Sequence, residues 1–146
     1  MRGYFGIGIY NAKTSENVGT LWRSAHIMGA AFIFTIGTRI KPQASDTTKA
    51  YRSIPYFRYT SLEDFKSAIP YDCPVVGIEN IPQSIKIKAY THRERCIYLL
   101  GAEDNGLSTE AKALCKEMII LPGTYCYNVS VAGSLVMYDR LMKEDQ

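Results

Sequence analysis

Short apolar runs alternate with segments of helical period along this chain, and that alternation limits the fold more than any other feature. The run 31–37, Ala-Phe-Ile-Phe-Thr-Ile-Gly, is continuous, as strands buried on both faces of a parallel sheet are. The pattern predicts an α/β fold, a mostly parallel sheet flanked by helices, in a single domain over 1–146. The predicted strands are 3–10, 31–37, 74–79, 95–100 and 116–121, and the predicted helices are 18–30, 61–68, 108–115 and 128–142.

Two of these helices carry further signals. Ser61 and Asp64 form a capping box in which Asp64 replaces the usual Glu, so a helix is expected to begin at this point. The terminal helix is expected to pack on the sheet through an apolar face. That predicted face consists of Val131, Leu135, Val136, Tyr138 and Leu141.

Composition excludes several classes of protein. With 47% apolar and 21% charged residues, the chain has the composition of a soluble globular protein. It has no apolar run of the ~18 residues that span a membrane, and its start lacks the pattern of a secretory signal. A cytoplasmic location is therefore expected. The four cysteines are widely spaced without a CxxC pair, which favours reduced thiols over disulfides or a zinc site.

The formal net charge is only +3, but basic residues gather in the middle of the chain. They alternate there with aromatic residues, a pattern that suits RNA phosphates and unstacked bases. A solvated loop whose aromatic side chains pack on the core explains the pattern equally well. The candidate RNA-binding residues are Arg39, Lys41, Lys49, Arg52 and Arg58, and the aromatic residues are Tyr51, Tyr56, Phe57 and Tyr59.

Loops of small and polar residues follow three of the predicted strands. They cover 11–17, 101–108 and 121–132. Ligands of open α/β sheets bind beyond the carboxyl ends of the strands, so these loops are the candidate ligand site. Dinucleotide, phosphate-loop and nucleophile-elbow motifs are absent from the sequence. The two histidines, His26 and His92, are far apart, so common hydrolytic or redox chemistry is not indicated.

The start of the first predicted helix carries an unusual set of residues. Gly19 lies early in the helix, where glycine costs roughly 1 kcal/mol relative to alanine. Its presence is explained if another group approaches the backbone closely. Asn17 and Arg23 flank it, and a guanidinium can fork onto a phosphate or a carboxylate. Arg23 therefore either binds an external anion or pairs with an internal acid such as Glu103.

Three segments in this order resemble the three motifs of the TrmH (SpoU) branch of the SPOUT methyltransferases. The first is 17–25, Asn-Val-Gly-Thr-Leu-Trp-Arg-Ser-Ala, and the second is 99–108, Leu-Leu-Gly-Ala-Glu-Asp-Asn-Gly-Leu-Ser. The third is 120–123, Ile-Leu-Pro-Gly, followed by 127–132, Tyr-Asn-Val-Ser-Val-Ala. The resemblance covers nearly the whole chain. It implies the SPOUT fold with a C-terminal deep trefoil knot, S-adenosyl-L-methionine as cofactor, a homodimer, and metal-independent 2′-O-methylation of RNA ribose.

The resemblance also assigns roles to individual residues. Arg23 would be catalytic through electrostatic and positional assistance, since a guanidinium is a poor base. Asn17 would support it, Glu103 would orient the second-motif loop or the arginine, and Asn128 would lie beside the reacting centre. The cofactor pocket would be formed by Gly77, Ile78, Gly101, Gly106, Leu121, Cys126 and Val129.

One residue departs from the family pattern. Cys126 stands where the third motif usually has serine, and its effect depends on whether the family uses the serine hydroxyl or only its backbone. The chain also lacks the additional RNA-binding domains of many relatives, so the catalytic domain and its dimer mate would hold the RNA. By analogy with small members of the branch, tRNA is the expected substrate, at the anticodon loop. The alternatives are an inactive RNA-binding module and a methyltransferase that acts on ribosomal RNA.

Overall fold

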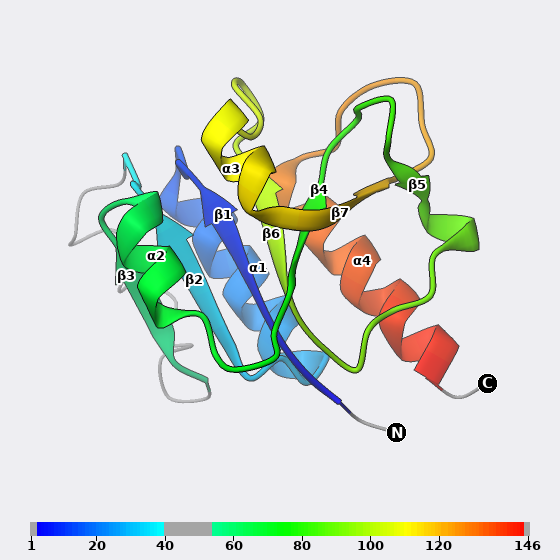
Figure 1. The fold of residues 1–146 in the computed structure, drawn as a ribbon, viewed down its shortest axis with the longest axis horizontal. Helices are drawn as coiled ribbons and strands as arrows, with labels where there is room; N and C mark the ends of the chain where they lie inside the picture. Colours follow the sequence, from blue (N-terminus) through cyan, green and yellow to red (C-terminus); the bar gives the residue numbers. More distant parts are fainter. Residues whose placement is uncertain (1–2, 40–53, 145–146) are drawn as a thin grey trace.

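The computed structural model describes residues 3–39 and 54–144. Over these residues the chain forms one seven-stranded sheet in which every strand pair is parallel (Figure 1). The strand order is β3-β2-β1-β6-β4-β7-β5. The strands are β1 (Tyr4–Tyr10), β2 (Phe32–Ile36), β3 (Tyr56–Tyr59), β4 (Val75–Ile78), β5 (Ile85–Lys86), β6 (Arg95–Gly101) and β7 (Cys115–Ile120). This confirms the predicted α/β fold with a parallel sheet. The knot stays a prediction.

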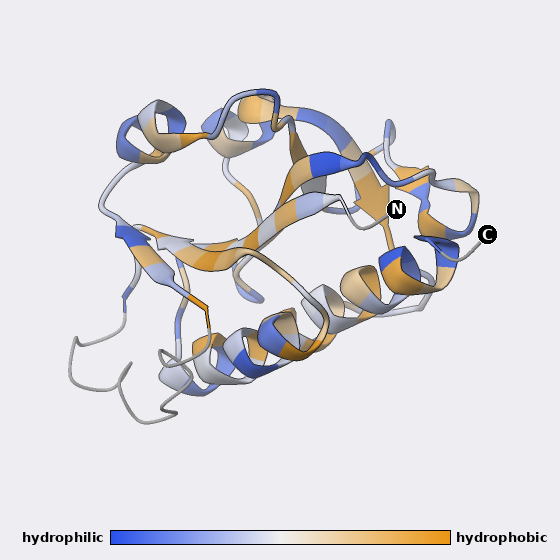
Figure 2. Ribbon diagram, turned by 90° about the horizontal axis from the view of Figure 1, so that it is seen from below, coloured by the Kyte–Doolittle hydropathy of each residue, from blue (hydrophilic) through white to orange (hydrophobic). Residues whose placement is uncertain are grey.

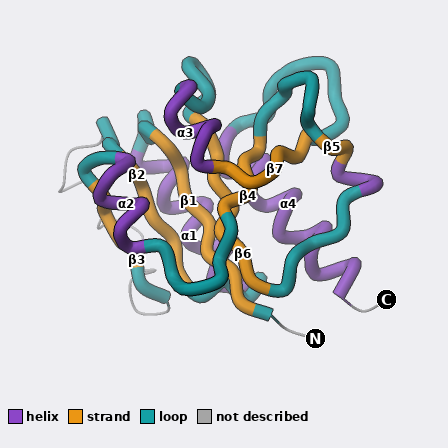
Figure 3. The backbone as a smooth tube through the Cα atoms, in the orientation of Figure 1, coloured by secondary structure: helices purple, strands orange, loops and turns teal. Residues whose placement is uncertain are grey.

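Helices cover both faces of the sheet (Figures 2 and 3). They are α1 (Ser15–Ile27), α2 (Leu62–Ala68), α3 (Thr109–Leu114) and α4 (Val129–Glu144), with a 3-10 turn η3 (Ile87–Ala89). On one face, Leu21 of α1 and Val136 of α4 belong to a core that includes Ile7 of β1. On the other face, Phe65 of α2 and Ala111 of α3 belong to a second core. The inner strands are buried on both sides, which is why they are continuous apolar runs in the sequence.

The helix starts follow from capping. Ser61 Oγ accepts a hydrogen bond from Asp64 N at 3.1 Å, which confirms the predicted cap of α2. The first helix begins at Ser15, earlier than predicted, because Thr14 Oγ1 accepts from Asn17 N at 3.3 Å. Asn17 therefore lies within the first turn of α1.

Two edge strands were not predicted from the sequence. β5 has two residues, too few to show a period. β3 carries three of the four aromatic residues considered for RNA binding: Phe57 is 44% exposed, whereas the two tyrosines pack inwards, and Tyr51 lies outside the described residues. The Tyr56 ring lies 5.1 Å from the Trp22 ring, and its hydroxyl is 2.9 Å from Thr35 Oγ1. The Tyr59 ring lies 5.6 Å from that of Phe65. These two partly buried tyrosines therefore pack against the cores on the two faces of the sheet.

The predicted apolar face of α4 is wrong for most of its members. Val131 is 46% exposed and Tyr138 is 56% exposed, and Leu135 also faces solvent. Of the predicted face only Val136 is buried; the other buried residues of the helix are Val129, Ser130, Ala132, Gly133, Met137 and Arg140. Small residues determine which face of α4 packs on the protein. Gly133 lets the helix approach α1 closely, because a Cβ at this position would lie only 2.6 Å from Leu21 Cδ1. Val131, Leu135 and Tyr138 remain exposed on the opposite face of the helix.

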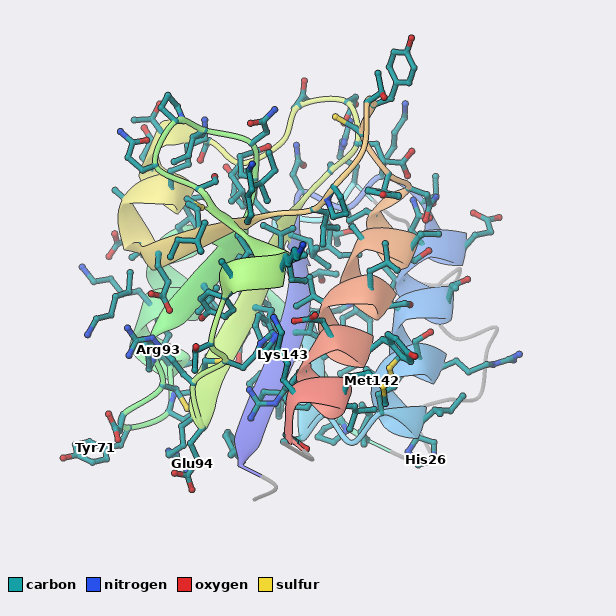
Figure 4. The ribbon with its side chains drawn as sticks, turned by 90° about the vertical axis from the view of Figure 1, so that its right-hand side faces the viewer. His26, Tyr71, Arg93, Glu94, Met142 and Lys143 are labelled. Carbon is teal, nitrogen blue, oxygen red and sulfur yellow. The ribbon has the colours of Figure 1, made fainter. Side chains whose placement is uncertain are left out.

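Arg140 anchors the C-terminal half of α4 from inside the protein. Its side chain is 2% exposed. Nη1 donates to the carbonyl oxygen of Arg93 at 2.7 Å and to Tyr98 Oη at 3.0 Å, and Nη2 donates to the carbonyl oxygen of Glu94 at 2.9 Å. Glu94 lies at the lower left of the molecule in Figure 4, with Arg93 above it. A buried guanidinium with these partners fixes α4 against the start of β6.

Replacing Arg140 with methionine is expected to lower the free energy of unfolding by about 3 kcal/mol, because the buried carbonyl groups lose their donor. Urea denaturation followed by circular dichroism measures this change. Lys66→Ala, at an exposed position of α2, is the control and should change stability little. Equal stability of Arg140→Met and wild type would contradict the anchoring role.

Candidate active site

The carboxyl ends of four adjacent strands meet at one edge of the sheet. β6 lies between β1 and β4, and β7 follows β4. Backbone hydrogen bonds join the ends: Ala102 N donates to the Tyr10 carbonyl oxygen at 3.2 Å, and Glu79 N donates to that of Ile119 at 3.1 Å. The polar loops that were predicted to form a ligand site therefore start next to one another.

A cavity of about 600 Å³ lies at this edge. Its wall includes six of the seven residues predicted to bind a cofactor, namely Ile78, Gly101, Gly106, Leu121, Cys126 and Val129. Gly77 does not line it: this glycine is buried within β4, and a Cβ there would lie 2.4 Å from Met118 Sδ. The role of Gly77 as a direct cofactor ligand stays a prediction, and the structure gives it a packing role.

Several residues of the cavity wall were not predicted from the sequence. Glu79, Lys112, Tyr125 and Tyr127 line it as well. Glu79 follows β4 directly and was included in the predicted strand 74–79, so its position at a strand end was the available signal. Lys112 comes from α3, and only the tertiary fold brings it to the cavity.

Glycines allow two backbone segments to approach closely beside the cavity. Gly106 N donates to the Ala102 carbonyl oxygen at 2.8 Å, and Gly106 has a φ of +63°. A Cβ on Gly101 would lie 2.4 Å from the Gly106 carbonyl carbon. Leu107 N donates to Glu79 Oε2 at 2.8 Å and ties this turn to the end of β4. The turn after β6 therefore requires glycine at both positions.

Three of the four predicted catalytic side chains form a hydrogen-bonded cluster. Asn17 Nδ2 donates to Glu103 Oε1 at 2.9 Å. Asn128 Nδ2 donates to Asn17 Oδ1 at 2.9 Å and to Glu103 Oε1 at 3.2 Å. The three residues come from α1, the loop after β6 and the start of α4. The fold thus brings together groups that are as much as 111 positions apart.

Asn128 also caps α4. Its Oδ1 accepts hydrogen bonds from Ser130 N at 3.0 Å, from Val131 N at 3.3 Å and from Ser130 Oγ at 2.5 Å. One amide group therefore serves the helix with its oxygen and the polar cluster with its nitrogen.

Arg23 lies on α1, six residues after Asn17, or about 9 Å along the helix axis. Its side chain is exposed, and within the described ranges it forms no hydrogen bond or ion pair. The internal pairing with Glu103 considered from the sequence does not occur, because Glu103 accepts from the two asparagines. The guanidinium is available to an external anion.

The predicted RNA-binding cations fall into three groups. Lys41, Lys49 and Arg52 lie outside the described residues. Arg58 is exposed on β3, with its guanidinium carbon 5.5 Å from the centre of the Tyr56 ring. Arg39 forms an ion pair with Asp104, with an Nη1–Oδ2 distance of 2.9 Å. This ion pair lowers the pKa of Asp104 to about 2, chiefly through the hydrogen bonds from Arg39.

Neither histidine lines the cavity. His26 is exposed on α1, and His92 lies between Tyr98 Oη and Asp139 Oδ2, each 2.7 Å from a ring nitrogen. Burial lowers the pKa of His92. Among the described residues, no three His, Cys, Asp or Glu side chains are grouped as a metal site, and no helix has the length and apolarity to cross a membrane.

The sequence profile of the SpoU rRNA Methylase family matches residues 5–138. The chain belongs to the SpoU family. The matched range includes the whole cavity wall and the Asn17–Glu103–Asn128 cluster. A comparison with curated proteins gives no match.

Solved structures with the SpoU fold superpose on nearly the entire chain. The SpoU methyltransferase AviRb from Streptomyces viridochromogenes, in complex with AdoMet, has a TM-score of 0.85 at 19% identity, covering 100% of this chain and 60% of AviRb. An AdoMet-bound rRNA methyltransferase from Sinorhizobium meliloti has a TM-score of 0.82 at 21% identity, covering 98% and 57%. This chain thus spans about three fifths of the length of these two relatives.

A third solved structure matches over its full length. It is described by the words "2-OH methylation of C/U34 on tRNA", and its TM-score is 0.84 at 18% identity, with 99% of each chain covered. At these identities the three likenesses establish a common fold.

Gly101→Ala is expected to weaken binding of S-adenosyl-L-methionine about tenfold or more. The new Cβ would collide with the backbone of the turn at Gly106, and overpacking of this kind costs about 1–3 kcal/mol. Isothermal titration calorimetry measures the affinity. Gly37→Ala is the control for a general loss of stability: its φ of +61° strains alanine there too, but the position lies outside the cavity wall and cofactor affinity should stay near the wild-type value. Equal losses in both variants would contradict the role of Gly101.

Proposed function

We propose that this chain transfers a methyl group from S-adenosyl-L-methionine to a ribose 2′-hydroxyl of tRNA, at the anticodon loop. The observation that carries the proposal is the Asn17–Glu103–Asn128 cluster beside a glycine-walled cavity. The full-length likeness to the structure described by C/U34 methylation supports tRNA as the substrate.

The cavity suits the cofactor. Close backbone approach at Gly101 and Gly106 leaves room for adenine and ribose against main-chain groups. Glu79 and Glu103 add carboxylates to the wall, while Lys112 is a basic residue there, a balance compatible with a cationic ligand. When bound, S-adenosyl-L-methionine supplies an activated methyl group, so no metal is needed.

The described side chains would align the reaction rather than carry protons over long distances. Asn17 and Asn128 hold Glu103 Oε1 in one position, so the wall of the cavity is preorganised near the start of α4. The Arg23 guanidinium would bind the RNA phosphate or the ribose oxygen and stabilise negative charge there as the hydroxyl loses its proton. A guanidinium is a poor base, so the hydroxyl proton would pass to solvent.

The direct test is incubation of the protein with methyl-labelled S-adenosyl-L-methionine and undermethylated bulk tRNA, followed by digestion and identification of the nucleosides. A labelled 2′-O-methyl nucleoside from tRNA is the expected product. A labelled product from ribosomal RNA and none from tRNA would show that the protein is a ribosomal RNA methyltransferase. RNA binding without any transfer would favour the inactive module.

Arg23→Ala is expected to reduce methyl transfer at least about a hundredfold, because a preorganised charge in the transition state is lost. The affinity for S-adenosyl-L-methionine should stay near the wild-type value, since Arg23 does not line the cavity. Single-turnover transfer and calorimetry measure the two quantities separately. A large loss of cofactor affinity would instead assign Arg23 a structural role.

The exposed stripe of α4 is the proposed dimer contact. Val131, Leu135, Tyr138 and Met142 face solvent there, and Ile27 of the adjacent α1 is also exposed. In Figure 4 α1 and α4 run side by side, with Met142 and His26 on the side that they form. A cluster of exposed apolar side chains on adjacent helices is typical of an association surface.

Leu135→Glu is expected to convert a dimer to a monomer, because a charge would be buried at the contact. Size-exclusion chromatography with light scattering measures the mass. Tyr71→Glu is the matched control, since Tyr71 is exposed far from α4 in Figure 4 and should leave the mass unchanged. A monomeric wild type would overturn this assignment.

A further inference from the structure

Arg39 ties together the loops that follow three different strands. Its Nη1 donates to Asp104 Oδ2 at 2.9 Å and its Nη2 donates to Asp104 Oδ1 at 3.0 Å, a two-pronged contact with the loop after β6. Nη2 also donates to the Asn11 carbonyl oxygen at 3.0 Å, after β1. The Arg39 backbone N donates to the Ala12 carbonyl oxygen at 2.9 Å. Arg39 itself follows β2.

The contact acts on the residue next to Glu103. Glu103, Asp104 and Asn105 form the tip of a turn closed by the bond from Gly106 N to the Ala102 carbonyl oxygen. All three tip side chains are exposed, so burial does not hold them in place. The two asparagines donate hydrogen bonds to Glu103, and Arg39 donates hydrogen bonds to Asp104. A shift of Asp104 therefore moves Glu103.

We propose, on the basis of the function above, that Arg39 is a positioning residue that holds the Glu103 loop in its reactive arrangement, and not a ligand of RNA phosphate. Both terminal nitrogens of its guanidinium, Nη1 and Nη2, donate hydrogen bonds to the Asp104 carboxylate. The pKa of Asp104, lowered to about 2, keeps this carboxylate charged throughout the pH range of an assay. A change of pH within that range therefore does not remove the charge on either partner of the ion pair.

The experiment compares Arg39→Ala, Arg39→Lys and Asp104→Asn with the wild type in steady-state transfer to tRNA. All three variants should lower kcat roughly tenfold to a hundredfold, because small displacements of aligned groups have effects of this size. The KM for tRNA should change little. The melting temperature should stay within about 4 °C of wild type, since exposed ion pairs contribute little to stability.

Asp104→Asn separates the two roles of Arg39. If Arg39 bound RNA phosphate, this variant would release the guanidinium and leave the KM for tRNA unchanged or lower, with kcat intact. Arg39→Lys would then also keep much of its function, since lysine binds phosphate as a point charge. A raised KM for tRNA confined to Arg39→Ala would overturn the proposal.

Two further variants sharpen the test. The double variant Arg39→Ala/Asp104→Asn should lose no more activity than either single variant, because both remove the same contact. Lys13→Ala is the control: its Nζ lies 3.9 Å from Asp104 Oδ2, its side chain is 61% exposed, and it should keep the wild-type kcat. Additive losses in the double variant would contradict a shared role.

A readout without catalysis distinguishes this inference from the proposed function. The side-chain amide signals of Asn17 and Asn128 report their bonds to Glu103 in heteronuclear NMR spectra. Arg39→Ala and Asp104→Asn should shift both signals, and Lys13→Ala should not. If the wild type transfers no methyl group, the proposed function is wrong. The amide signals of the variants still show whether Arg39 positions the Glu103 loop. Unchanged signals would overturn it.

Discussion

Parallel pairing of β6 with β1 on one side and β4 on the other is the constraint on which the site depends. The register pairs Tyr10 with Gly101 and Ile78 with Leu100, so these three strands end at the same level. Because the strands are parallel, the loops after them emerge at one edge. If the register of β6 against β1 shifted by one residue, Ala102 N would no longer face the Tyr10 carbonyl oxygen, and the turn that follows Gly101 would move with it. The cavity and the polar cluster are thus consequences of sheet register.

Two kinds of close contact turn this edge into a defined site. Backbone meets backbone at Gly101 and Gly106, where a single added carbon has no room. Helix meets helix where Gly133 of α4 faces Leu21 of α1. The second contact sets how near the start of α4 comes to the start of α1, and hence Asn128 to Asn17. A small residue that does not itself line the cavity therefore contributes to its geometry.

The sequence predicted the parts of the molecule that local pattern determines, and missed those that depend on distant partners. The inner strands are continuous apolar runs, so they were found, whereas β3 (Tyr56–Tyr59) is held as a strand by pairing with β2. The apolar stripe of α4 was assigned to the core by hydropathy, although Gly133 and Ala132 made the other stripe pack. Hydropathy alone does not separate a core stripe from an outward one.

The candidate site shows the same division. Resemblance to a family identified Asn17, Glu103 and Asn128, but their mutual hydrogen bonds required the fold. Arg39 was assigned to RNA because it lies among other basic residues, while its partner Asp104 is 65 positions away. The charge of a residue is visible in a sequence, whereas the group that satisfies the charge is not.

Asn128 both caps α4 and joins the polar cluster, and this restricts the residues that can replace it. Serine, threonine or aspartate would cap α4 as well as asparagine does. Only asparagine adds an N–H donor on the same short planar group, and that donor reaches Asn17 and Glu103. Selection for a stable helix and selection for an ordered site therefore act on one side chain. As a result, formation of the first turn of α4 and completion of the polar cluster are one event.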